Sequence, residues 1–138
     1  MDMMVTIESK ITDNVGQQEN TKETYNCLYG KRETDRIINY MRNEASVVIK
    51  IPKERKDCGN KIKIRTTGEV RNEINVEEGR TCRVAYNTGY GIIDMLTVGQ
   101  VVDYEMTDSG GYIKLKYEMR TENAELINNI EMKIEVKE

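Results

Sequence analysis

The chain has 138 residues, and its 21 basic residues nearly cancel 24 acidic ones to leave a formal net charge of −3. This length predicts one domain spanning residues 1–138. The balanced charge argues against a nucleic-acid-binding protein, because little counterion release would drive binding. The absence of histidine excludes imidazole-dependent catalytic triads and the usual zinc sites. No apolar stretch is long enough to span a bilayer. We therefore predict no metal, no cofactor and no membrane partner.

The three cysteines favour a reducing compartment. Cys27, Cys58 and Cys82 are an odd number and cannot all pair in disulfides. The amino-terminal residues also lack the basic flank and apolar run of a secretory signal. We therefore predict a cytoplasmic protein. Cys58 has no base and no second cysteine near it in the sequence, so we expect an inert thiol.

Apolar residues alternate with polar ones along most of the chain, which is the period of an antiparallel strand with one buried face. In chain order, the positions expected to point inward are Val5, Ile7 and Ile11; Tyr25, Cys27 and Tyr29; Val47, Ile49 and Ile51; Ile62 and Ile64; Val70, Ile74 and Val76; Cys82, Val84 and Tyr86; Ile93 and Met95; Val102, Tyr104 and Met106; Ile113, Leu115, Tyr117 and Met119; and Ile130, Met132, Ile134 and Val136.

Turn-forming residues separate these segments. They are Asp13-Asn14 with Gly16, Gly59-Asn60, Glu78-Gly79, Thr88-Gly89 with Gly91, Val98-Gly99, and Ser109-Gly110-Gly111. The pattern predicts an all-β antiparallel meander of about 8–10 strands. An open meander of that size would expose two long edges, so we expect closure into a barrel or folding into a sandwich.

Two segments need separate interpretation. From Thr34 to Glu44 the apolar residues fit a helical face, with Thr34 as its cap, but they also fit a strand in which Arg42 and Glu44 follow inward-pointing neighbours. We predict a strand. The stretch from Lys50 to Lys56 is the one basic cluster along the sequence, and we expect it to form a solvated hairpin tip.

An ordered series of short motifs resembles the YwiB-like bacterial family of unknown function. The motifs are Ile62–Gly68, Glu78-Gly79, Ala85–Met95, Gly111–Tyr117 and Asn129, with a looser match over Gly30, Asp35–Tyr40 and Glu44. The resemblance implies a calycin-like antiparallel barrel, related in shape to lipocalins, and a strand from Thr34 to Glu44. It implies no established activity, ligand or catalytic residue.

Tyrosine supplies all the aromatic side chains, since the chain has eight tyrosines and neither phenylalanine nor tryptophan. Six of them alternate in step with the apolar residues of their strands and are therefore expected to point inward: Tyr25, Tyr29, Tyr40, Tyr86, Tyr104 and Tyr117. A buried hydroxyl without a hydrogen-bond partner costs about 1–3 kcal/mol. These rings therefore either lie near the barrel ends, with hydroxyls in solvent or on backbone carbonyls, or line a cavity for a small amphipathic ligand.

Several polar residues extend this candidate site. Arg42, Glu44 and Asn72 occupy positions in the strand alternation that are expected to point inward. An arginine–glutamate pair at a barrel end either orients a ligand head group or closes the barrel with a salt bridge and no ligand. The alternation around Ile62 and Ile64 predicts that the Arg65 side chain points outward, unless a bulge near Thr66 reverses its direction. The candidate ligand-binding residues are Tyr40, Arg42, Glu44, Arg65, Tyr86, Tyr104 and Tyr117.

Two functional hypotheses follow from the sequence. The first is a non-enzymatic barrel that binds a small amphipathic ligand in a tyrosine- and methionine-lined interior. The second is a protein-interaction module, with a homodimer as one form, that has no small-molecule ligand. No residue is predicted to be catalytic, and we expect the protein not to be an enzyme.

Overall fold

The computed structural model describes residues 2–138, which form ten antiparallel β-strands in one sheet. The strands are β1 (Met3–Asp13), β2 (Gln18–Lys31), β3 (Asp35–Arg42), β4 (Ala45–Pro52), β5 (Lys61–Thr67), β6 (Arg71–Glu77), β7 (Thr81–Asn87), β8 (Ile92–Thr107), β9 (Gly110–Thr121) and β10 (Leu126–Lys137).

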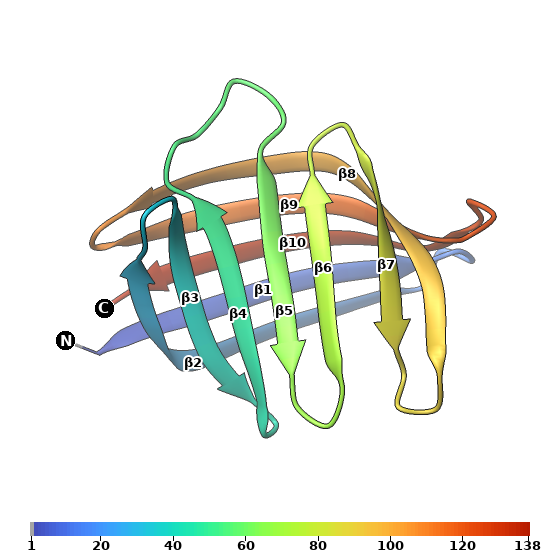
Figure 1. The fold of residues 1–138 in the computed structure, drawn as a ribbon, viewed down its shortest axis with the longest axis horizontal. Coiled ribbons are helices and arrows are strands. Elements are labelled where there is room, and N and C mark those ends of the chain that lie inside the picture. The colour runs from blue at the N-terminus through green and yellow to red at the C-terminus, as the bar shows by residue number, and fades with distance from the viewer. Residues whose placement is uncertain (1) are drawn as a thin grey trace.

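The sheet curls into a nearly closed barrel with two crossing layers. Its strand order is β6-β5-β4-β3-β2-β1-β10-β9-β8-β7. The strands that begin and end the chain, β1 and β10, therefore pair with each other near the middle of the sheet. Figure 1 shows β1, β9 and β10 in one layer and the shorter strands β3–β7 crossing in front of them. The long strands β2 and β8 bend and take part in both layers. The predicted antiparallel all-β barrel is confirmed.

The core lies between the layers and follows the alternation of the sequence. Its largest fully buried side chains are Ile38, Ile49, Ile51, Ile62, Ile113 and Ile134. Charged residues fill the outward positions between them, as in β9, where Lys114 and Lys116 flank the buried Leu115. The segment Asp35–Arg42 is strand β3, with Ile38 and Tyr40 buried, which confirms the prediction of a strand there.

The structure corrects one turn that was predicted from the sequence and adds one that was not. The prediction of a turn at Val98-Gly99 is wrong, because both residues lie inside the continuous strand β8, just before a β-bulge between Gly99 and Val101. The sequence also did not predict the turn between β3 and β4, which is formed by Asn43 and Glu44 at φ values of 49° and 68°. Two consecutive positive φ angles are typical of the tight hairpin turn that matches the twist of its strands.

Side chains join the two end strands of the sheet. The Asn72 amide on β6 donates a hydrogen bond to the carbonyl of Asn87 on β7 (3.1 Å) and accepts one from the Asn87 N–H (2.7 Å). Thr97, fully buried on β8, donates its hydroxyl proton to the Asn75 carbonyl on β6 (2.8 Å). Since an amide side chain has the donor and acceptor of a peptide group, Asn72 continues the hydrogen bonding of the sheet across this seam.

The seam also requires a glycine. A Cβ atom added to Gly99 would lie 2.0 Å from the carbonyl oxygen of Glu77, whereas one added to Gly30 on β2 would meet nothing within 4 Å. We therefore expect Gly99→Ala to lower the free energy of unfolding by about 1–3 kcal/mol or more, because backbone must move. Gly30→Ala is the matched control and should change it by less than about 1 kcal/mol. Urea denaturation of both variants checks this, and equal effects would contradict the close approach.

Candidate functional site

A cavity of about 150 Å³ lies between the two layers of the barrel. Apolar side chains from both layers form half of its wall: Ile7, Val47, Ile49, Ile64, Met132 and Ile134. Polar groups line the remainder: Ser9, Thr21, Glu23, Tyr40, Arg42 and Thr66. The site therefore combines an apolar interior with a charged pair of residues.

The path of β2 creates this space. β2 pairs with β1 from Gln18 to Cys27 but with β3 only from Cys27 onward. Beyond Tyr40, therefore, the end of β3 is no longer hydrogen-bonded to β2. The cavity lies where these two strands diverge, and side chains instead of backbone bridge the gap.

Arg42 and Glu23 form this bridge. The Arg42 Nε atom lies 3.2 Å from Glu23 Oε2, and the second guanidinium nitrogen Nη2 donates to Oε1 at 3.3 Å. This two-point contact fixes the orientation of the guanidinium. Because about half of the Arg42 side chain is exposed, solvent screening limits the stabilisation to at most about 1 kcal/mol. The pair therefore positions charge at the cavity more than it stabilises the fold.

Two tyrosines complete the arrangement. The Tyr25 hydroxyl donates a hydrogen bond to the Glu23 carboxylate, and the Tyr25 ring stacks on Tyr40 with centroids 5.0 Å apart. Burial raises the pKa of Tyr40 to about 12, with the nearby Arg42 charge opposing the shift. The bond to Glu23 is the main cause of the raised pKa of Tyr25. Both phenols stay protonated at neutral pH, so they serve as hydrogen-bonding groups and not as bases.

The structure brings some of the sequence-predicted residues together and separates others. Tyr40 and Arg42 both line the cavity. Glu44 does not pair with Arg42; it lies exposed in the β3–β4 turn, and Glu23 from β2 takes the place expected for it. Arg65 is on the outer face of β5, as its parity predicted, between two residues that face the cavity.

The remaining predicted tyrosines lie elsewhere in the barrel. Tyr104 and Tyr117 are only 3% and 4% exposed, in a part of the core that does not border the cavity. Burial raises the pKa of Tyr117 to about 12. The buried Tyr104 hydroxyl has no hydrogen-bond partner among residues 2–138. Tyr86 is half-buried on β7, opposite Ile93. The tyrosines therefore do not form one aromatic pocket.

A second polar cluster, which the sequence did not reveal, closes the opposite end of β3. Arg36 pairs with Asp108 of the β8–β9 turn at 2.8 Å, and the Tyr29 hydroxyl donates to the Thr107 carbonyl at 2.5 Å. The hydrogen bond from Arg36 holds the pKa of Asp108 below its usual value. Strand parity could not find this cluster, because a turn residue brings in the carboxylate.

Two larger hollows lie at the surface. A groove of about 870 Å³ follows the divergence of β2 and β3, and Tyr40 lines both this groove and the cavity. The other hollow, of about 730 Å³, lies over the outer face of β1, β2, β9 and β10. Across residues 2–138, no cluster of histidine, cysteine, aspartate or glutamate is suited to a metal ion. Over the same residues, none of the structure is a helix with the length and apolarity needed to cross a bilayer.

Comparison with known proteins places the chain in a family. The sequence profile of a domain of unknown function, DUF1934, matches residues 5–134. The chain belongs to the DUF1934 family. Among solved structures, this DUF1934 chain is similar to the crystal structure of the ywiB protein from Bacillus subtilis, with a TM-score of 0.82 and 15% identity over 99% of this chain and 90% of that one. At this identity the likeness establishes the fold alone. A search of curated proteins found no match.

The raised pKa of Tyr40 predicts a pH dependence of stability. Below about pH 10 the phenol is protonated in both the folded and unfolded chain; between about pH 10 and 12 the unfolded chain loses its proton first, so stability falls as pH rises. Tyr40→Phe should reduce that slope by up to about 1.4 kcal/mol per pH unit. Unfolding free energies measured by denaturant across this range check the prediction, and parallel curves for wild type and variant would contradict it.

Proposed function

We propose that this DUF1934 protein is a non-enzymatic binder of a small amphipathic molecule, held in the cavity beside Arg42 and Glu23. The observation that supports this most directly is the combination of six apolar wall residues with a charged, two-point pair around one cavity. An apolar ligand body would pack against Ile49, Ile64 and Ile134. Its polar head would exchange hydrogen bonds with Arg42, Glu23 or the Tyr40 hydroxyl.

The size of the cavity limits the ligand. A cavity of about 150 Å³ is of the size that accommodates benzene. Burying about five methylene groups contributes roughly 4 kcal/mol, which alone gives a dissociation constant of about 1 mM. A charged hydrogen bond of about 1.5–3 kcal/mol would improve this to about 10–100 µM. The ligand is therefore limited to a molecule of about the size of benzene or a short alkyl chain.

The diverging strands β2 and β3 provide the access route. Tyr40 borders both the interior cavity and the outer groove, and its stacked partner Tyr25 lies beside it. A shift of these two side chains would connect the two spaces without breaking a backbone ladder, because the pairing of β2 with β3 ends at Cys27 and Tyr40. The three free cysteines also favour a reducing, cytoplasmic location.

Filling the cavity tests the proposal. Thr66 lines it, whereas Thr67 is the exposed next residue on β5, so Thr66→Phe and Thr67→Phe make a matched pair. We expect hexanoate and 1-hexanol to bind the wild type with a dissociation constant of about 1 mM or tighter, and Thr66→Phe to weaken both at least about tenfold. Thr67→Phe should bind normally. Arg42→Gln should weaken hexanoate but not hexanol, since only hexanoate carries the charge that Arg42 attracts.

Ligand-detected NMR measures this binding. The cavity proposal is wrong if neither probe binds, or if Thr66→Phe and Thr67→Phe bind them equally. A thermal unfolding scan of each variant confirms that a loss of binding does not reflect a loss of fold.

An apolar hairpin tip favours a second candidate function, self-association. Tyr90, in the turn between β7 and β8, is fully exposed, and Ile92 and Ile93 at the start of β8 are 67% and 52% exposed. The expectation that Ile93 points inward is therefore wrong. Exposed apolar side chains that gather on a surface mark a candidate association site, and here Tyr90 lies beside two exposed isoleucines that point to opposite faces of β8. This observation supports a homodimer, and it does not involve the interior cavity.

Sedimentation equilibrium over a wide concentration range tests this candidate. A dimer built on the tip should dissociate more readily after Tyr90→Ser, because the ring would lose its apolar contact. Val15→Ser removes a comparably exposed residue from the β1–β2 hairpin and is the control. A wild-type chain that stays monomeric at every concentration would exclude the homodimer.

A further inference from the structure

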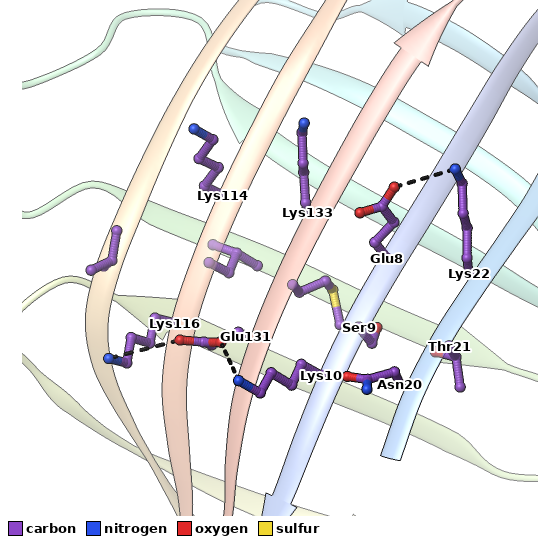
Figure 2. A pocket seen from close by; sticks show the side chains of 13 residues that line it. Glu8, Ser9, Lys10, Asn20, Thr21, Lys22, Lys114, Lys116, Glu131 and Lys133 are labelled. Carbon is purple, nitrogen blue, oxygen red and sulfur yellow. Dashed lines mark ion pairs between the residues drawn. The ribbon is translucent and has the colours of Figure 1, made fainter. Parts of the chain in front are cut away.

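Lysines from four strands gather on the outer face of the long-stranded layer. Figure 2 shows Lys10, Lys22, Lys114, Lys116 and Lys133 around the hollow of about 730 Å³, together with Glu8 and Glu131. They come from β1, β2, β9 and β10, so they are far apart along the chain. We call these five lysines and two glutamates the lysine face.

Most of the lysine face alternates in sign from strand to strand. Glu131 lies between Lys10 and Lys116 in the register and is 3.9 Å from each ammonium. Glu8 pairs with Lys22 at 3.5 Å. Opposite charges in neighbouring strands stabilise a sheet modestly, by about 0.2–1 kcal/mol for each pair.

Lys114 and Lys133 break this alternation. They are directly opposite each other in the register of β9 and β10. Both point outward, because their strand neighbours Ile113, Leu115 and Ile134 are buried. Figure 2 shows the two side chains extended in the same direction. Like charges placed directly opposite destabilise a sheet.

Nearby carboxylates offset only part of this repulsion, because Glu8 and Asp103, the neighbours of Lys133 and Lys114 on the adjoining strands, form ion pairs with other residues. Within the described chain, neither lysine has a carboxylate at ion-pair distance: Glu8, the other cross-strand neighbour of Lys133, pairs with Lys22. Asp103, next to Lys114 in the register, pairs instead with Arg55 at 2.7 Å. Lys114 lies over the Tyr112 ring, 5.4 Å from its centroid. The two lysines therefore have no ion-pair partner within residues 2–138, and they leave a local excess of positive charge at the hollow that both line.

We infer that the lysine face binds a compact, multiply charged anion of the phosphate class between Lys114 and Lys133. Such an anion converts the repulsion between the two ammonium groups into two attractive contacts. Lysine is a frequent phosphate ligand that acts as a point charge. This site is separate from the interior cavity and takes a different ligand class.

The surrounding acids favour a compact anion over a polymer. The outward residues two positions along the same strands form a neighbouring row across the sheet. In that row, Glu135 of β10 and Glu105 of β8 lie on either side of Tyr112 of β9. Asp103 ends the row that contains the two lysines. A long polyanion crossing the face would meet these carboxylates, whereas a small anion would contact only the lysines. This explains how an anion site exists on a chain with a net charge of −3.

Backbone-amide NMR titration with inorganic pyrophosphate, at constant ionic strength, tests the proposal. We expect saturable shifts confined to β9 and β10 around Lys114 and Lys133. Lys114→Gln/Lys133→Gln should weaken binding at least tenfold, and Lys61→Gln, an exposed lysine on β5, should not change it. Shifts that never saturate, or equal binding by the double variant and the wild type, would overturn the site.

Two further measurements make the result decisive. In phosphate-free buffer the double variant should melt at the same temperature as the wild type or higher, because removing both charges removes their repulsion; this shows that lost binding is not lost folding. Vesicles containing anionic lipid and a single-stranded RNA oligonucleotide are tested in parallel. Tighter binding to either than to pyrophosphate would overturn the assignment to a small anion.

Discussion

The barrel depends on bringing the two end strands of a ten-stranded sheet together. An unpaired edge exposes a row of peptide donors and acceptors that can template aggregation. Here the amide of Asn72 bonds both backbone groups of Asn87, Thr97 bonds the Asn75 carbonyl, and Gly99 allows the Glu77 carbonyl to approach. Side chains thus satisfy edge groups where a regular ladder is not formed. This arrangement lets the layers cross steeply and still protects both edges.

Crossing layers require strands that change layer, and the candidate site is a consequence of that requirement. β8 bends at a bulge beyond Gly99, and β2 exchanges one neighbour for another at Cys27. The gap left beside β2 is spanned by Arg42 and Glu23 and is filled in part by the Tyr25–Tyr40 stack. Since both phenols have raised pKa values and no histidine is present, the groups here suit recognition better than proton transfer.

The inner and outer faces of the same strands carry different chemistry. Inward residues of β1 and β10 form the wall of the cavity, and outward residues of these strands, with those of β2 and β9, form the lysine face. The backbone lies between the two sites, so a ligand at one would not contact a ligand at the other. A period of two residues is what allows one sheet to present an apolar pocket on one side and a charged surface on the other.

The sequence by itself determined most of the strands and most of their buried faces, because alternation is a local property that burial of one face imposes on each strand. Alternation left a barrel and a sandwich both open, and the choice of a barrel rested on the family resemblance. Its account of the site was partial. Tyr40 and Arg42 were found from parity, but the partner of Arg42 proved to be Glu23 and not Glu44. Gly99 was taken for a turn because glycine suits a turn and a close backbone approach equally. Only the tertiary structure decided these pairings, as it did for Asn72 with Asn87 and Lys114 beside Lys133, because register and closure join residues that no local pattern relates.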